Sequence, residues 1–342
     1  MAVDEVLLAE PRGFCAGVEK AIKALAWMVK AFDAPVYCYH EIVHNQHVVQ
    51  RFVDQGVIFV DDVNEVPAGA PLMLSAHGSA PAVVEMARDA NRVVVDAVCP
   101  LVTKVHHELK VRARKGYQVL YVGHAGHEEA VGTMAVAPEA VHLVQSEADL
   151  ERAASVIEPG TPVALLSQTT LSHDEWSSLR EMAQERFPDL WMPNRSDLCF
   201  ATTNRQAALR EIAAKADVVV VIGSANSSNT VALATVAAAS GCARVLRVNG
   251  ADELPDDLEG IIGVTAGASA PERLVVEVIE RLAPVRGVSL VKVTDEDEYF
   301  PPPPELRELL RRLESEEGGG ALSLDDDRSI SAAEVLEGLG SR

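Results

Sequence analysis

The sequence predicts an α/β protein with mainly parallel sheets, and three observations carry this prediction. Short β-branched runs alternate with stretches of helical periodicity along most of the 342 residues, as in repeated β-α-β units. The composition is 48% hydrophobic but only 4% aromatic, so the core must consist of Ala, Val, Leu and Ile, which suits buried strands and close helix packing. Cys15, Cys99 and Cys199 each precede a predicted helix, which suggests three small α/β lobes.

The strands are predicted from short apolar runs rich in Val and Ile. In chain order they are residues 6–8, 36–38, 57–60, 72–74, 93–95, 119–122, 163–166, 218–222, 245–248 and 261–264. Stretches in which apolar residues recur with the helical period follow many of these runs. The helices predicted from them are residues 18–31, 81–89, 103–115, 174–186, 204–216, 230–240 and 271–282.

Polar and glycine-rich turns come directly after many of the predicted strands. They are PRGFCAG, SAHG, DAVCP, GHAGHEE, SQTT, GSANSSN and TAGASAP. Parallel α/β sheets bind ligands at the carboxyl ends of their strands. Because reactive side chains concentrate in these turns, we expect the functional site to be built from them.

We expect the chain to divide into three α/β lobes and a tail. The lobes are residues 1–98, 99–197 and 198–285, each with one of the three cysteines. The tail, residues 286–342, carries an acidic run at 295–298, prolines at 301–304 and glycines at 318–320. A charged helix is predicted over 305–316, and we expect the tail to be partly disordered.

The charge of the chain excludes whole classes of partner. Lys and Arg number 30 against 51 Asp and Glu, for a formal net charge of −21. Such a chain has no general attraction for nucleic acid or an anionic membrane, so an anionic ligand needs a locally organised site. No apolar run is long enough to span a membrane, and no signal-peptide pattern is found. Five cysteines without a C-x-x-C pair argue against a disulfide framework, so we expect a cytoplasmic location.

Cys15, Cys99 and Cys199 are the candidate metal ligands. Each lies in a turn before a helix, and a helix N-terminus favours the thiolate that acts as nucleophile or metal ligand. Three such residues at corresponding places fit a metal or iron–sulfur site, although unrelated core thiols explain the spacing equally well. Cys38 and Cys242 are expected to be buried apolar residues.

Five polar residues in the predicted turns are candidates for binding and proton transfer. His44, His77 and His127 have small polar neighbours, where imidazoles can bind an anion, although a lone histidine is usually structural. Glu129 can hold a proton if its carboxyl group is desolvated, or it is an ordinary solvated acid. Thr169 can orient a substrate hydroxyl or cap the helix that follows.

Ser227, Ser228 and Asn229 lead from a predicted strand into a helix, and Ser269 precedes another helix. Hydroxyl groups and free N–H groups at a helix start can cradle a phosphate. The alternative is a simple helix cap, since Ser and Asn are good N-cap residues. The sequence has no G-x-x-x-x-G-K-[ST] and no convincing G-x-G-x-x-G, which argues against a P-loop or a standard dinucleotide site.

Nine motifs of the sequence resemble those of the LytB/IspH family and occur in the same order. They are PRGFCAGVEKAI, HEIVHN, SAHG, DAVCPLVTKVH, GHEEAVGTM, SQTTLS, DLCFATTNRQ, GSANSSNT and GVTAGASAPE. The resemblance runs from about residue 6 to about residue 282. Members of this family are 4-hydroxy-3-methylbut-2-enyl diphosphate reductases, oxidoreductases that carry out the last step of the non-mevalonate (MEP) isoprenoid pathway.

The resemblance implies three α/β lobes in pseudo-threefold arrangement around a central [4Fe–4S] cluster. The family's three cysteines match Cys15, Cys99 and Cys199, which would leave one iron without a protein ligand. Such an iron can act as a Lewis acid, and the cluster can deliver electrons one at a time.

The same matching implies roles for the polar residues. The diphosphate is expected to be bound by His44, His77, His127, Ser227, Ser228, Asn229 and Ser269. Thr169 should contact the substrate hydroxyl, and Glu129 should supply the proton. The implied reaction is a reductive dehydroxylation of the allylic diphosphate to isopentenyl and dimethylallyl diphosphates, with electrons from a carrier such as ferredoxin or flavodoxin.

Two other functions are compatible with a cluster-bearing chain. One is a non-redox iron–sulfur dehydratase, and the other is a non-enzymatic cluster-bearing sensor. The ordered diphosphate-binding motifs, and the lack of an arginine cluster for a carboxylate substrate, favour the reductase.

Overall fold

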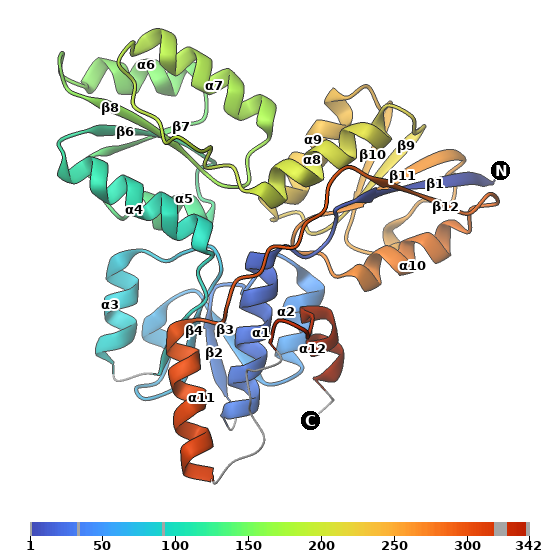
Figure 1. Cartoon of the computed structure of the whole chain (residues 1–342), viewed down its shortest axis with the longest axis horizontal. Coiled ribbons are helices and arrows are strands. Elements are labelled where there is room, and N and C mark those ends of the chain that lie inside the picture. Colours follow the sequence, from blue (N-terminus) through green and yellow to red (C-terminus); the bar gives the residue numbers. More distant parts are fainter. Residues whose placement is uncertain (1, 33–34, 91–92, 318–326, 340–342) are drawn as a thin grey trace. The chain divides into compact units, whose positions relative to one another are not determined.

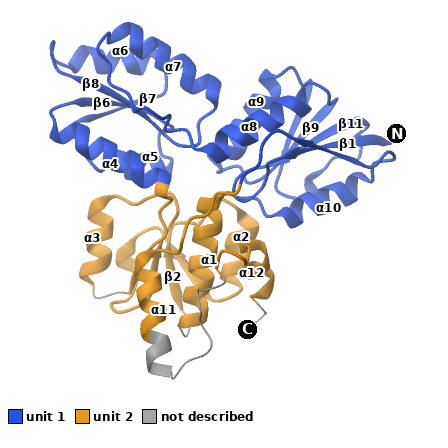
Figure 2. Cartoon of the chain, in the orientation of Figure 1, with its two compact units in different colours: residues 1–14, 101–296 blue, residues 15–100, 297–342 orange. Residues whose placement is uncertain are grey.

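The computed structural model describes residues 2–32, 35–90, 93–317 and 327–339, and it confirms the predicted α/β class (Figure 1). The strands form three sheets, and every strand pair in the described residues is parallel. The chain folds into two compact units, residues 1–14 with 101–296 and residues 15–100 with 297–342 (Figure 2). Each unit therefore combines segments that are far apart in the sequence.

The first unit holds a five-stranded sheet in the order β10–β9–β11–β1–β12. Its strands are β1 (Val3–Glu10), β9 (Val218–Ile222), β10 (Arg244–Val248), β11 (Gly260–Ala266) and β12 (Val288–Lys292). The run VVVVI of β9 is buried along its whole length, and its alternate side chains enter two different cores, as the pleat of a strand requires. Helix α10 (Glu272–Leu282) packs on one face, and α8 (Phe200–Ala213) and α9 (Ser228–Ala239) pack on the other (Figure 1).

The same unit holds a three-stranded sheet in the order β7–β6–β8. Its strands are β6 (Gln118–Val122), β7 (Val141–Val144) and β8 (Val163–Ser167). Leu120 and Val122 face α6 (Glu147–Val156) and α7 (His173–Arg186). Val119 and Tyr121 face α4 (Pro100–Arg114) and α5 (Glu128–Met134) on the opposite side.

The second unit is built on a four-stranded sheet in the order β3–β2–β4–β5. Its strands are β2 (Val36–Tyr39), β3 (Val57–Val60), β4 (Leu72–Leu74) and β5 (Val94–Asp96). One face packs with Val63 of a 3-10 turn (Val63–Glu65) and with α3 (Pro81–Asp89). Cys38 is fully buried in β2, as predicted. The remaining helices of this segment are α1 (Ala16–Ala31) and α2 (Gln46–Val53).

The tail contains more structure than the single helix predicted. Strand β12 joins the first unit, while α11 (Pro304–Glu317) and α12 (Ala332–Gly338) belong to the second. Helix α12 lies against α1, where the Glu19 carboxylate accepts the Ala332 N–H at 2.7 Å and Lys23 Nζ donates to the carbonyls of Asp327 and Ile330 at 2.7 and 3.2 Å. The predicted disorder that falls on 318–326 lies outside the described residues.

Several elements differ from the sequence-based expectation. Strand β1, predicted in the first lobe, pairs with β11 and β12, because its apolar residues complete the core of that sheet. Strand β7 and helices α2, α5 and α6 were not predicted. These elements are short, and a few residues carry little periodic signal. The lobe boundaries at 98/99, 197/198 and 285/286 stay a prediction.

No helix among the described residues has both the length and the apolar character needed to cross a bilayer.

Candidate active site

Cys15 and Cys99, two of the three predicted metal ligands, both lie beside Gly17 in the second unit. Cys15 is the N-cap of α1, and its thiol makes no capping hydrogen bond. A Cβ atom placed on Gly17 would lie 2.9 Å from Cys99 Sγ and 3.9 Å from Cys15 Sγ. The glycine therefore leaves a space next to both sulfur atoms. Neither cysteine forms a disulfide in the described part of the chain, and both are partly exposed, so this space and its donors fit a thiolate-bound metal group.

Lys20 places a cation near Cys99. Its ammonium group is buried and donates to the Val98 carbonyl at 2.8 Å. Burial lowers the pKa of Lys20, and the negative charge of the Cys99 thiolate opposes that shift. A buried positive charge beside a cysteine favours its thiolate, which is the form that binds metal.

His44 and His77, predicted to bind an anion, are stacked in the second unit. Their ring centroids are 3.9 Å apart, and the ring planes differ by 12°. His44 Nδ1 lies 3.3 Å from a carboxylate oxygen of Glu41. The Cys99 N–H donates to the carbonyl of Ala76 at 2.9 Å, so backbone contacts join the Cys99 turn to the turn of His77.

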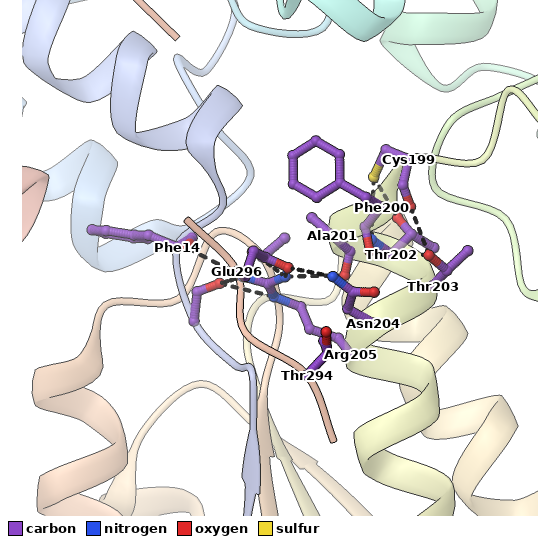
Figure 3. Close-up of polar contacts among 12 residues, drawn as sticks. Phe14, Cys199, Phe200, Ala201, Thr202, Thr203, Asn204, Arg205, Thr294 and Glu296 are labelled. Atoms are coloured by element: carbon purple, nitrogen blue, oxygen red, sulfur yellow. Dashed lines mark hydrogen bonds and ion pairs between the residues drawn. The ribbon is translucent and has the colours of Figure 1, made fainter. Parts of the chain in front are cut away.

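Cys199, the third predicted metal ligand, is the N-cap of α8 in the first unit (Figure 3). Its Sγ accepts the Thr202 N–H at 3.2 Å and lies 2.9 Å from Thr202 Oγ1. Donors directed at a sulfur atom favour its thiolate form. The Cys199 N–H donates to the carbonyl of Thr169 at 3.0 Å, so the Cys199 turn adjoins the SQTT turn that follows β8.

Glu129 and Thr169 contact each other directly inside the first unit. The Glu129 carboxylate accepts the Thr169 N–H at 2.7 Å and the Thr169 hydroxyl at 3.0 Å. The Glu129 side chain is nearly inaccessible, at 2% exposure, whereas Glu128 is partly exposed. Glu129 is therefore not a solvated loop acid. His127 is the N-cap of α5, and its Nδ1 accepts the Glu129 N–H at 3.1 Å.

The start of α9 gathers the predicted phosphate-binding residues. Ser227 is its N-cap and accepts the Thr230 N–H, as the capping interpretation predicts. Asn229 Oδ1 accepts the Ala268 N–H at 2.9 Å, which joins this turn to the one that contains Ser269. Both Asn229 and Ser269 are buried. The first turn of α9 carries no acidic side chain, so the positive end of its dipole can attract an anion.

Gln168 is a site residue that the sequence analysis did not single out. Its side chain is fully buried, and its Nε2 donates to Ser228 Oγ at 3.1 Å and to Thr170 Oγ1 at 2.9 Å. Thr170 Oγ1 also donates to Ser228 Oγ at 3.0 Å. These contacts bring the carboxyl end of β8 to the N-terminus of α9. Only its place in the SQTT turn pointed to this residue.

The comparison with known families decides where the chain belongs. The sequence model described as LytB protein matches residues 6–283. The chain belongs to the LytB protein family. Two curated relatives in this family are each named 4-hydroxy-3-methylbut-2-enyl diphosphate reductase. The relative from Leifsonia xyli subsp. xyli is 48% identical over 309 residues, covering 88% of this chain and 90% of its own. The relative from Rhodopirellula baltica is 46% identical over 308 residues, which cover 89% of this chain and 96% of the relative.

Two solved structures of diphosphate reductases are similar in fold to this chain. The structure of the E-1-hydroxy-2-methyl-but-2-enyl-4-diphosphate reductase from Plasmodium falciparum superposes with a TM-score of 0.86 at 30% identity, covering 92% of this chain and 99% of that one. A second structure, titled as (E)-4-hydroxy-3-methyl-but-2-enyl diphosphate reductase, the terminal enzyme of the non-mevalonate pathway, has a TM-score of 0.59 at 27% identity. It covers 82% of this chain and 99% of its own. The LytB family is therefore supported by sequence and by fold.

Proposed function

We propose that this chain is an iron–sulfur oxidoreductase that converts 4-hydroxy-3-methylbut-2-enyl diphosphate to isopentenyl and dimethylallyl diphosphates. The allylic C–O bond breaks, and two electrons and two protons enter. One proton joins the departing hydroxyl to form water, and the other reaches carbon in the product. The curated relatives are named as reductases of this substrate.

The observation that carries the proposal is the convergence of three turns in the first unit. Gln168 connects the end of β8 to Ser228 at the start of α9. The neighbouring Thr169 holds the Glu129 carboxylate and also accepts the Cys199 N–H. A candidate acid, a candidate metal ligand and a candidate anion site thus share one hydrogen-bonded network, which supports a reaction that would combine proton transfer, a metal group and a diphosphate substrate.

Cys15, Cys99 and Cys199 would hold a [4Fe–4S] cluster, with one iron left without a protein ligand. When bound, this group supplies electrons one at a time and a Lewis-acidic iron. The space beside Gly17 and the donors of Thr202 support the assignment of these thiolates. A ferredoxin, a flavodoxin or a similar carrier would supply the electrons.

The diphosphate would be bound without a patch of Lys and Arg. His44, His77 and His127 supply imidazole donors, and Ser227, Ser228, Asn229 and Ser269 supply hydroxyl and amide donors. The N-terminus of α9 adds its backbone N–H groups and its dipole. Imidazole, hydroxyl and amide donors of this kind would let a chain of net charge −21 bind a strong anion without such a patch.

Glu129 would deliver the proton to the substrate hydroxyl. Its near-complete burial keeps bulk solvent away from the acid. Thr169 fixes the orientation of this carboxyl group through two hydrogen bonds. The Thr169 oxygen can at the same time accept a hydrogen bond from the substrate hydroxyl, which places that hydroxyl next to the acid.

The test is an anaerobic purification with visible absorption and iron and sulfide counts. The allylic diphosphate is then added with dithionite and a viologen mediator, and the products are analysed. A brown protein that forms both five-carbon diphosphates only with reductant supports the proposal. Turnover without reductant would indicate a dehydratase, and a cluster without turnover would indicate a sensor. A chain that stays colourless after reconstitution would refute the cluster and the reductase together.

Two cysteine variants test the ligand assignment within the same preparation. We expect C99S to lose the cluster and the activity, because it removes a sulfur atom next to Gly17. C38S is the matched control, since Cys38 is a fully buried residue inside β2. Equal iron content in the two variants would remove Cys99 from the ligand set.

A further inference from the structure

Arg205 is the largest fully buried side chain among the described residues, and only 1% of it is exposed. It lies in α8, less than two turns after Cys199. Its Nε and Nη2 donate to the Gly13 carbonyl at 3.1 and 2.8 Å, and Nη2 also reaches the Phe14 carbonyl at 3.2 Å (Figure 3). A buried guanidinium group is costly unless its donors are all occupied. Its position is therefore strongly determined by these partners.

Glu296 neutralises this buried cation. Both of its carboxylate oxygens accept from Arg205 Nη1, at 2.9 and 3.1 Å, and one oxygen also accepts from Asn204 Nδ2 at 3.0 Å (Figure 3). The Glu296 side chain is 11% exposed, although it lies in the acidic run of the tail. This residue is outside the segment that the family model matches, residues 6–283.

The topology explains how a tail residue reaches this place. Strand β12 runs parallel to β1, with Lys292 opposite Glu10, and the Val293 N–H donates to the Glu10 carbonyl at 3.1 Å. The two strands end at the same edge of the sheet. Beyond that edge, one segment continues to Gly13 and the other to Glu296. Gly13 has a φ of +65°, and a Cβ atom there would lie 3.2 Å from the Ala270 carbonyl.

We propose that Arg205 and Glu296 are positioning residues for the iron–sulfur site, an inference that rests on the proposed function. Arg205 binds the peptide groups immediately before Cys15 and extends from the helix that Cys199 caps. The pair thus sets the backbone that leads into two of the three proposed ligands. Glu296 keeps the guanidinium fixed by pairing its charge. Neither residue contacts the substrate or the cluster in this role.

The experiment compares the holoenzyme with the variants E296Q, E296D and R205K. E296Q keeps the shape of the side chain but removes its charge, E296D keeps the charge, and R205K keeps a cation without the planar fork. D295N is the matched control, because Asp295 is the preceding residue and forms an exposed ion pair with Lys292. The readouts are the rate at which an iron chelator bleaches the cluster, the EPR spectrum of the reduced cluster and the unfolding temperature of the cluster-free chain.

We expect E296Q and R205K to lose the cluster about 10- to 100-fold faster, in line with the 10- to 100-fold loss of metal affinity that follows removal of a residue that supports metal ligands. The EPR spectra of these two variants should change. E296D should lose the cluster at a rate between those of E296Q and the wild type, and D295N should lose it at the rate of the wild type. Bleaching of E296Q at the rate of D295N, with an unchanged spectrum, would overturn the inference. So would a lower unfolding temperature with unchanged cluster properties, since the pair would then only stabilise the fold.

If E296Q does not fold, R205K and E296D decide by the same criteria. The iron count of the wild type is measured first and separates the two proposals. A wild type without a cluster refutes the proposed function, whereas a stable cluster in E296Q refutes only the positioning role.

Discussion

The carboxylate of Glu129 accepts two hydrogen bonds from one residue, Thr169, through its backbone N–H at 2.7 Å and its hydroxyl at 3.0 Å. Both groups are buried. The arrangement fixes the orientation of the acid. Such a carboxyl group can take up a proton and release it to a substrate while its position stays constant.

We therefore expect E129Q to bind the allylic diphosphate normally but to turn over at least about 100-fold more slowly, the usual range for the loss of a general acid. The amide cannot donate an acidic proton, while the diphosphate site remains intact. Calorimetric binding and steady-state kinetics on the same preparation separate KM from kcat. E128Q is the matched control, because Glu128 is the preceding, more exposed acid. Slow turnover in E128Q with normal turnover in E129Q would transfer the role of proton donor to Glu128.

A substitution at Gly17 tests cluster binding without replacing any of the proposed ligands. A methyl group at this position would lie 2.9 Å from Cys99 Sγ, so the sulfur atom must move. We expect G17A to fold but to lose its iron roughly tenfold faster to a chelator. G338A is the control, because Gly338 is also helical and has open space around it. Iron loss at the same rate in both variants would show that the sulfur position does not matter.

The parts of this fold that the sequence predicted are those where one element carries a strong local pattern. The run VVVVI of β9 and the apolar period of α10 each identify a buried element. Strand β12 has the pattern VSLVK and is mostly exposed, so it lacks the apolar signature of the other strands. Its place depends on pairing with β1, which lies almost 300 residues away in the chain.

The site residues also divide into those with a local sequence signal and those without one. Motifs at strand ends pointed to Glu129, Thr169 and Ser228 because parallel sheets place ligands there. Arg205 looked like an ordinary helix residue, and Glu296 looked like one charge in a solvated acidic run. Only their contact identifies them, and a pairing over 91 residues leaves no local signal.

Lys23 tests how much the tail stabilises the second unit. Its ammonium group is buried, donates to two tail carbonyls and lies 3.4 Å from the Asp327 carboxylate. K23M keeps the length of the side chain but leaves that carboxylate without its cation. We expect a loss of about 3–5 kcal/mol in the free energy of unfolding, as for other broken buried pairs. K30M is the control, since Lys30 is exposed in the same helix. Urea unfolding measures both, and equal midpoints would mean that the tail contributes little there.

His106 gives a prediction about acid stability. It lies in α4, its Nε2 is buried without a hydrogen-bond partner, and burial lowers its pKa from 6.5 to about 4. Below pH 6.5 the unfolded chain binds a proton at this histidine while the folded chain does not. The stability that the neutral form provides is therefore complete above pH 6.5 and is lost as the pH falls toward 4. The loss should reach about 2 kcal/mol by pH 5.

H106L removes this titration and should make urea unfolding of the cluster-free chain less dependent on pH between 7 and 5. The free energy of unfolding of the wild type minus that of H106L should fall by about 2 kcal/mol from pH 7 to pH 5. H107L is the matched control, because His107 is the next residue in the same helix and is exposed. Comparison with H107L separates the effect of the buried ring from that of an added leucine in this helix. If H106L and the wild type lose stability in parallel, His106 is charged in the folded chain and burial does not depress its pKa.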